Sequence, residues 1–311
     1  MSPPNPFLVR LKGMTTILLA GVAVIDFVFR LDTMPRAAEK YRATDAAISG
    51  GGCAANAAVA IARLGGRACL AARLGADPVG DMIVSGLEGE GVDCSLAKRF
   101  DDCRSSFSSV YVDAVGERQI VNFRDPSLSF DASWLTERLP DAFDAALADT
   151  RWPQGAAALL LAARRKTRPG VLDAEAPIAE AREAMAAASH IAFSMQGLRD
   201  YSGRDDVEWG LRKVVDETGA WACVTDGSKG VTFLLGKTLG HVPAFAVESV
   251  DTLGAGDVWH GAFALGLGEG MQEIAAIRFA NAVAAMKCTR FGGRAGIPRR
   301  PEVEEFMRTH Q

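Results

Sequence analysis

The sequence lacks the paired cysteines and clustered histidines from which disulfide scaffolds and zinc sites are built. Its six cysteines include no C-x-x-C pair, and its four histidines form no H-E-x-x-H or H-x-H cluster. Scattered cysteines are typical of small core residues in a reducing compartment, and a zinc site held by protein ligands is not expected. The cysteines are Cys53, Cys69, Cys94, Cys103, Cys223 and Cys288, and the histidines are His190, His241, His260 and His310.

Long apolar runs and an excess of basic residues are also missing. No run reaches the roughly 18 apolar residues that a membrane span needs, and the formal net charge is −4. We therefore expect neither a membrane nor a nucleic acid as partner, and we expect a cytoplasmic protein. Residues 1–13 are rich in proline and have no apolar signal segment, so we expect a disordered extension there, or a true start at Met14.

The chain does contain a regular alternation of apolar strands and amphipathic helices. Residues 15–27 form one apolar run, which predicts a single buried strand ending near Asp26, and residues 53–66 place apolar side chains at helical spacing. The alternation resumes after residue 143 and continues to the end. The pattern predicts one α/β domain over residues 14–311, in which helices cover both faces of a mostly parallel sheet.

The middle of the chain follows a different pattern. Residues 105–123 alternate between apolar and polar side chains, turn at 115–117 and alternate again, which predicts a β-hairpin. Residues 29–50 are candidates for its partner strands. We therefore expect a small β-sheet lid formed by residues of about 28–49 and 105–124.

One glycine-rich segment, VDTLGAGDVWHG at 250–261, indicates an anion-binding site. We expect it to join a strand at 241–250 to a helix. Gly254 and Gly256 let the backbone approach a ligand, and the helix adds free N–H groups and the positive end of its dipole. An acid at this place, Asp257, suits a base that takes a proton from an attacking hydroxyl. The alternative is a tight turn in which Asp257 only caps the helix.

The motif D-T-x-G-A-G-D resembles the C-terminal signature of the ribokinase-like (PfkB) carbohydrate kinases, and Gly51–Ala58 with the following ARLGG resembles their first signature. The resemblance runs from about Met14 to the C-terminus. It implies a three-layer sandwich with a β lid, Asp257 as catalytic base, and an anion hole at Gly254, Ala255 and Gly256. It also implies that Asp26, Gly52 and Asn56 bind the sugar. In the alternative, Asp26 is a turn acid and Asn56 only bonds backbone.

The same resemblance implies a nucleotide site and a metal. The nucleotide loop would contain Thr225, Gly227, Ser228 and Gly230, and Asn281 would line an adenine pocket, although all five could be polar surface residues without a role. ATP needs Mg²⁺, but the acid of the family's N-x-x-E motif is missing, because residues 194–197 are Ser-Met-Gln-Gly. Asp173 could contact the metal through water, or could cap a helix. A monovalent cation such as K⁺ near Asp251 and the 290–296 loop, and a homodimer formed through the lid, are further expectations from the family.

Several short segments resemble the bacterial 6-deoxy-6-sulfofructose kinases, among them G-E-R-x-I-x-N at 116–122 and K-C-T-R-x-G-G-R-A-G-I-P at 287–298. This resemblance implies that Lys40, Asn122 and Arg151 hold an anionic group of the substrate. Two cations and an amide can surround a tetrahedral anion. Alternatively, Lys40 is a solvated lid residue and Arg151 pairs with Asp149 or stacks on Trp152. Asn56 departs from that subfamily, in which we expect threonine.

The function expected from the sequence is ATP-dependent phosphorylation of a primary hydroxyl on a sugar, with an anionic ketohexose as the preferred acceptor. A fructokinase, a ribokinase or a nucleoside kinase is the alternative. A catalytically silent sugar or nucleotide sensor on the same fold is a third, supported only by the missing N-x-x-E acid and opposed by the intact Asp257 loop.

Overall fold

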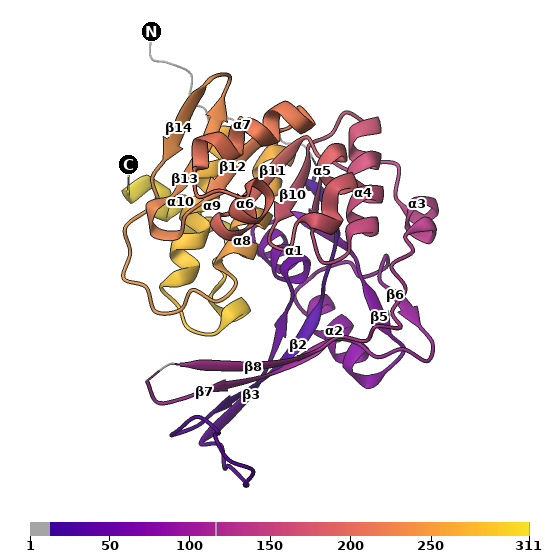
Figure 1. Cartoon of the computed structure of the whole chain (residues 1–311), viewed down its shortest axis with the longest axis vertical. Coiled ribbons are helices and arrows are strands. Elements are labelled where there is room, and N and C mark those ends of the chain that lie inside the picture. Colours follow the sequence, from indigo (N-terminus) through magenta and orange to yellow (C-terminus); the bar gives the residue numbers. More distant parts are fainter. Residues whose placement is uncertain (1–12, 116, 311) are drawn as a thin grey trace.

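The computed structural model of the protein describes residues 13–115 and 117–310. Its centre is an eight-stranded sheet, in which six strands are parallel and two antiparallel strands form one edge (Figure 1). In sheet order the strands are β14 (Thr238–Val242), β13 (Val231–Leu235), β12 (Trp221–Thr225), β11 (His190–Ser194), β10 (Gly170–Ala174), β9 (Ala145–Asp149), β1 (Thr16–Ala20) and β4 (Arg67–Ala71).

Helices cover both faces of this sheet and form two separate apolar clusters. Along β1, Ile17 and Leu19 belong to one cluster, whereas Leu18 and Ala20 belong to the other, so the strand is buried on both sides. The expected three-layer sandwich is confirmed. The first cluster includes α1 (Cys53–Arg63), α2 (Pro78–Glu88), α8 (Ala255–Gly268), α9 (Glu273–Cys288) and α10 (Arg300–Thr309), and the second α3 (Ser133–Arg138), α4 (Pro153–Arg165), α5 (Arg182–Ala187), α6 (Met195–Ser202) and α7 (Val207–Thr218).

A separate four-stranded sheet forms the lid, which projects from the body of the molecule (Figure 1). It consists of β3 (Asp45–Gly51), β2 (Val24–Arg30), β7 (Phe107–Val112) and β8 (Arg118–Phe123), in that order. The predicted hairpin is confirmed as β7 and β8, although Gly116 in its turn lies outside the described residues. A two-stranded sheet pairs β5 (Arg73–Gly75) with β6 (Lys98–Phe100).

The two faces of the lid differ in what they contact. Asp26 and Ser108 lie opposite each other on the face that lines the cavity, and Phe27 packs on Phe107 across the other face. Ile48 pairs with Phe27 on that second face and is exposed. The homodimer expected through the lid stays a prediction. The expected N-terminal extension, apart from Gly13, lies outside the described residues.

Two expectations about strands were wrong. Residues 15–27 form two strands in different sheets, because the chain leaves the central sheet at Gly21, where a Cβ atom would meet the Asp149 carboxylate at 2.1 Å. Asp26 therefore lies inside β2 of the lid and not at the end of the first strand. Residues 243–250 form no strand, and Pro243, at the start of this segment, has no N–H to give to a ladder. In addition, no sequence pattern had indicated α3 and α6.

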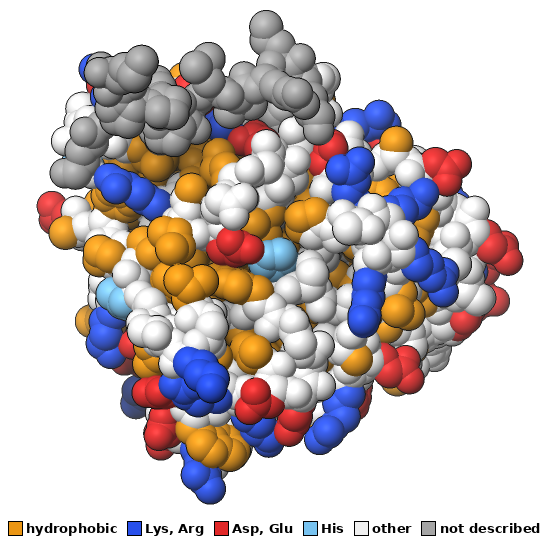
Figure 2. Space-filling view, turned by 90° about the horizontal axis from the view of Figure 1, so that it is seen from above, with side chains coloured by type: hydrophobic (Ala, Val, Ile, Leu, Met, Phe, Trp, Pro, Cys, Tyr) orange, Lys and Arg blue, Asp and Glu red, His pale blue; other side chains and the backbone are white. Residues whose placement is uncertain are grey.

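The surface opposite the lid carries Lys and Arg side chains interspersed with Asp and Glu side chains, apart from the part that grey atoms cover (Figure 2). No helix among the described residues combines the length and the apolar character that a bilayer crossing requires.

The N-terminal halves of α1 and α8 pack closely because a glycine lies at their contact. A Cβ atom on Gly261 would lie 2.6 Å from the carbonyl oxygen of Ala57 and 3.0 Å from its Cα. These atoms are backbone and cannot rotate away. The two helices carry Asn56 and Asp257, and they can approach this closely only because residue 261 has no side chain.

We predict that Gly261→Ala lowers the free energy of unfolding by about 1–3 kcal/mol, because the added methyl group overpacks the contact. The matched control is Gly86→Ala in α2, where a Cβ atom would meet no other atom within 4 Å. That change should stabilise by about 0.5–1 kcal/mol through helix propensity. Urea unfolding of both variants measures the difference, and a Gly261→Ala protein as stable as wild type would contradict the packing argument.

Candidate active site

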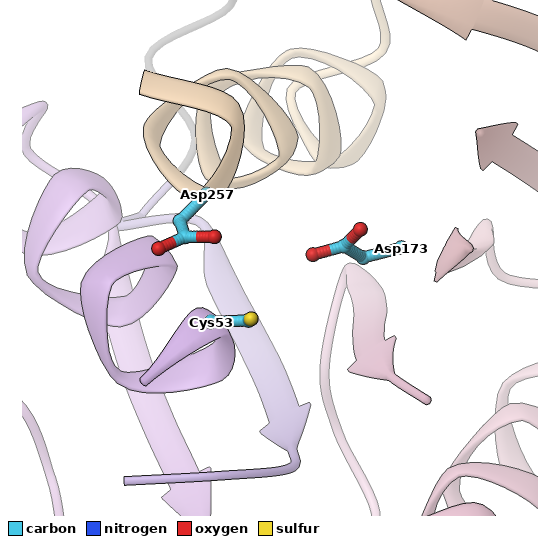
Figure 3. A group of neighbouring side chains, drawn as sticks. All are labelled: Cys53, Asp173 and Asp257. Carbon is cyan, nitrogen blue, oxygen red and sulfur yellow. The ribbon is translucent and has the colours of Figure 1, made fainter. Parts of the chain in front are cut away.

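The candidate site lies where the first turns of α1 and α8 meet the end of β10. Figure 3 shows Cys53 from α1, Asp257 from α8 and Asp173 from β10 around a common space. One ligand atom from each of the three lies within 4.8 Å of the others. The carboxyl ends of parallel strands and the N-termini of the following helices are where α/β sheets bind ligands.

The loop before α8 presents backbone N–H groups to this space. Gly254 adopts φ 72°, a left-handed conformation that glycine adopts readily, and α8 starts directly after it. The N–H of Ala255 donates to the carbonyl of Thr252 (3.1 Å), but within the described residues no protein acceptor is found for the N–H groups of Gly256 and Asp257. Those two groups and the helix dipole can therefore bind an anion. The N–H of Ala255, one of the predicted anion-hole residues, is thus used within the loop, and the role of Gly254, Ala255 and Gly256 as an anion hole stays a prediction.

Asp257 is held in place by Asn56 across the α1–α8 contact. The Asn56 amide Nδ2 donates to Oδ2 of Asp257 at 2.7 Å. Burial raises the pKa of Asp257 to about 6, which the Asn56 hydrogen bond opposes and the nearby Glu175 and Asp149 reinforce. A carboxyl group with this pKa is mostly ionised at neutral pH and is a stronger base than an ordinary aspartate. The structure thus brings together two of the predicted site residues.

Arg294 completes this arrangement and was missed in the sequence. Its Nε donates to Oδ1 of Asn56 (2.8 Å) and its NH2 donates to the carbonyl of Gly51 (2.9 Å). Burial lowers the pKa of Arg294 to about 10, against the raising effect of Glu90, Asp26 and Asp257, so the side chain stays charged at neutral pH. Arg294 lies in the K-C-T-R-x-G-G-R-A-G-I-P segment, but nothing in that pattern indicates a contact 238 residues away.

A cavity of about 1010 Å³ opens beside these residues, between the inner face of the lid and the body. Asp26, Ser49, Ser108 and Arg294 line it with polar groups, and Val110 and Ile120 are among its apolar walls. Burial raises the pKa of Asp26, with Ser108 and Arg294 opposing. The cavity is large enough for a sugar, and Asp26 can accept hydrogen bonds from hydroxyl groups there.

Gly52, at the start of α1, needs to be glycine. It adopts φ 96°, and a Cβ atom on it would lie 2.4 Å from the carbonyl oxygen of Val22. The start of α1 is further fixed by Asp149, whose Oδ2 accepts the N–H groups of Val22 (2.8 Å) and Ala54 (3.1 Å). These contacts place Asn56, one turn later, at its position beside Asp257.

Asp173 is buried, and one of its carboxyl oxygens makes no hydrogen bond within the described part of the chain. Its side chain is 5% exposed, and its Oδ1 has no hydrogen-bond partner among the described residues; Nε2 of His260 lies 3.5 Å away. Burial, with Glu175 and Asp257, raises its pKa well above the ordinary value. Asp173 lies in β10 and caps no helix, so that alternative is wrong. An unpartnered carboxyl oxygen facing Asp257 fits a hard cation such as Mg²⁺, whereas the thiol of Cys53 does not.

The backbone explains why the N-x-x-E acid is missing. At Gly197, which stands where that glutamate would be, a Cβ atom would lie 2.0 Å from the carbonyl oxygen of Ala174. Ser194 accepts the Gly197 N–H at 3.0 Å and caps α6. An acidic side chain at residue 197 would require a different path of the chain.

The predicted nucleotide residues lie in one loop after β12, apart from Asn281. Thr225 ends the strand, Gly227 and Ser228 belong to a single 3₁₀ turn, and Gly230 follows with φ 99°. Asn281 is 5% exposed: it accepts Nε1–H of Trp259 at 2.8 Å and donates to the carbonyl of Pro243 at 3.0 Å. Its amide is occupied, so it positions the segment after β14, and its predicted role at adenine stays a prediction.

The three residues predicted to hold an anion are not gathered in the cavity. Lys40 lies exposed in the loop between β2 and β3. Asn122 is on β8 and donates to Oγ of Ser108 at 3.1 Å. Arg151 donates to the carbonyl of Ala176 (2.9 Å) and pairs with Glu175 (3.2 Å) instead of the Asp149 carboxylate. Their role as a clamp stays a prediction.

Comparison with known proteins places the chain in a family. Residues 14–300 match the pfkB family carbohydrate kinases. Ribokinase from Bacillus subtilis is 27% identical over 296 residues, which cover 94% of this chain and 100% of that protein. A probable fructokinase-5 from Arabidopsis thaliana is 28% identical over 292 residues, covering 83% of this chain and 88% of the relative.

A solved structure supports the same assignment. The putative ribokinase from Agrobacterium tumefaciens superposes with a TM-score of 0.86 at 36% identity, covering 96% of this chain and 98% of that chain. The expected fold and the expected phosphotransferase class are confirmed, whereas these similarities do not extend to a sulfofructose kinase. The chain belongs to the pfkB family of carbohydrate kinases.

Proposed function

We propose that the protein uses ATP to phosphorylate a primary hydroxyl of a ribose-type or fructose-type sugar. The observation that carries this proposal is the position of Asp257. It is a carboxylate whose pKa is raised to about 6. It stands close to the cavity that contains Asp26 and beside two N–H groups, at the start of α8, that have no acceptor among the described residues. A base, an anion site and a sugar-sized cavity together fit phosphoryl transfer to an alcohol.

Asp257 acts as the base for the acceptor hydroxyl. Asn56 occupies Oδ2, which leaves Oδ1 to take the proton as the hydroxyl oxygen attacks the γ-phosphorus of ATP. The N–H groups of Gly256 and Asp257 and the dipole of α8 stabilise the negative charge on the transferred group. Closing the lid over the acceptor excludes water that would otherwise compete with the sugar.

Asp173 is the residue that would hold Mg²⁺ near the phosphates, directly or through water, because the one free carboxyl oxygen of Asp257 is needed to take the proton. The ion, bound with ATP, would neutralise part of the charge of the phosphate oxygens. Because residue 197 is glycine where the N-x-x-E motif has its acid, Asp173 is the described carboxylate best suited to bind the ion. It is buried, and one of its oxygens has no partner among the residues that the structure describes.

A neutral sugar is the acceptor that we infer, because none of the three residues predicted to hold an anion lines the cavity, although arginines such as Arg30 and Arg118 do. The residues that offer hydrogen bonds to hydroxyl groups, such as Asp26, Ser49 and Ser108, line it, whereas Lys40 and Arg151 do not. Relatives named ribokinase and fructokinase support the same choice. The finer expectation, an anionic ketohexose such as 6-deoxy-6-sulfofructose, would require Lys40, Asn122 and Arg151 to approach one substrate group.

We predict that Asp257→Asn lowers kcat about 10²–10⁴-fold with ribose or fructose, because the proton loses its acceptor. Coupled ADP release with Mg-ATP measures turnover, and the thermal shift given by Mg-ATP checks that the variant still folds and binds. The matched control is Asp216→Asn, an exposed change on α7. Turnover by Asp257→Asn within about tenfold of wild type would remove Asp257 as the base.

The acceptor class is tested with the exposed lysine of the lid. We predict that wild type phosphorylates neutral sugars, and that Lys40→Ala leaves KM for them within about twofold of wild type, as does the control Lys237→Ala in the β13–β14 turn. If turnover is instead confined to 6-deoxy-6-sulfofructose, and Lys40→Ala raises its KM about tenfold or more, the acceptor is anionic and the neutral-sugar proposal fails.

A further inference from the structure

A lysine is completely buried directly beneath the anion-binding loop. The Lys287 side chain is 0% exposed near the end of α9. Its Nζ donates to the carbonyl oxygen of Asp251 at 2.7 Å and lies 3.7 Å from Oδ2 of the same residue. A buried ammonium group is costly unless it is paired and hydrogen-bonded, because it loses its hydration. The two contacts with Asp251 offset that cost. No step of the proposed reaction uses it.

The partner of Lys287 organises two loops of the active site. The Asp251 carboxylate accepts N–H groups from Leu253 (2.9 Å), Gly292 (3.0 Å) and Gly293 (3.2 Å). Although burial alone would raise the pKa of Asp251, these bonds and Lys287 lower it to about 2. The carboxylate is therefore ionised at all physiological pH values. It pairs with Lys287 and, at 3.3 Å, with Arg118 of β8, and its contacts fix the loop before α8 to the loop after α9.

Both of these loops lead directly to the reacting groups. Residues 252–254 continue into the free N–H groups at the start of α8. The loop after α9 carries Arg294, which donates to Asn56, which in turn donates to Asp257. The Lys287–Asp251 ion pair thus fixes the loops that carry the anion-binding N–H groups and Arg294, although it contacts neither the N–H groups nor Asp257.

The monovalent cation expected near Asp251 does not fit this arrangement. A K⁺ ion is held by several oxygen atoms, usually backbone carbonyls. Here the Asp251 carbonyl already accepts from an ammonium group, and both carboxylate oxygens are used by N–H groups of the chain. A free cation at this place would also be repelled by the charge of Lys287.

We propose that Lys287 is a tethered cation that takes the place of a dissociable monovalent cation beneath the anion-binding loop. It is a positioning residue: its fixed charge holds Asp251, and through Asp251 the two loops, in the conformation that phosphoryl transfer needs. Catalysis by this chain is then independent of K⁺, in contrast to the expectation from the family resemblance.

The first arm of the test compares salts on the wild-type enzyme. Turnover is measured in about 100 mM KCl, NaCl and tetramethylammonium chloride, so that screening is the same in all three. We expect kcat to agree within about twofold. Activation by KCl of about tenfold or more relative to tetramethylammonium chloride would show that the protein uses a free cation, and would overturn the proposal.

The second arm removes the tethered charge. In Lys287→Met we expect kcat to fall about tenfold or more in tetramethylammonium chloride, with a smaller change in KM, and KCl to restore part of it. Lys237→Met, on an exposed turn, is the matched control. A wild-type kcat in Lys287→Met would overturn the proposal, and so would a loss that KCl does not restore, because Lys287 would then be only a structural residue.

The role proposed for Lys287 rests on the proposed kinase function, so a third arm needs no turnover. KCl should raise the melting temperature of Lys287→Met above its value in tetramethylammonium chloride and leave that of wild type unchanged. If Lys287→Met does not fold, Lys287→Gln replaces it, since the amide keeps a donor for Asp251. If the melting temperature of the Lys287 variant is the same in KCl and in tetramethylammonium chloride, the proposal is overturned. A wild type that phosphorylates no sugar contradicts the kinase function alone, and the melting temperatures still decide on Lys287.

Discussion

The hydrogen bond from Asn56 to Asp257 is the interaction on which the rest of the site depends. It joins the first turns of two helices that lie about two hundred residues apart in the chain. The helices can approach because Gly261 has no side chain against Ala57, and Asp149 holds the start of α1 by its backbone N–H groups. Arg294 then fixes the other end of the Asn56 amide. The carboxylate that we propose as the base is thus positioned by helix packing and by side-chain hydrogen bonds from other elements, more than by its own loop.

The electrostatics of the site follow from the same geometry. In addition to burial, Asp149, Glu175 and Asp257 raise the pKa of Asp173, and Asp149 and Glu175 raise that of Asp257. Asp149 accepts hydrogen bonds from backbone N–H groups, which oppose the rise of its pKa by burial, but Asp173 has a carboxyl oxygen that lacks a partner within the described residues. We therefore propose that this region binds a divalent cation together with the phosphates that accompany it. Beneath the anion loop, in contrast, the positive charge comes from the chain itself, because Lys287 is fixed there by its hydrogen bond to Asp251.

The sequence predicted those parts of the molecule that local pattern determines. The alternation of strands and helices, the hairpin at 105–123 and the glycine-rich start of α8 all follow from short-range rules, and the family motifs indicated Asp257 and Asn56. The break at Gly21 could not be predicted, because the Asp149 carboxylate that excludes a side chain there lies far along the chain. Arg294 and Lys287 were missed for the same reason: their partners are distant in sequence, and an isolated arginine or lysine gives no periodic signal.

The central claim, that burial and Asn56 tune Asp257 as the base, is tested most directly by the dependence of kcat/KM on pH, which reports the free enzyme. Because the base must be deprotonated and its pKa is raised to about 6, activity should fall as the pH drops through about 6. Asn56 donates to the charged form and lowers that pKa, so in Asn56→Leu the fall should move to higher pH. An acid limb near 4, the ordinary range of aspartate, or a limb that Asn56→Leu leaves in place, would contradict the account.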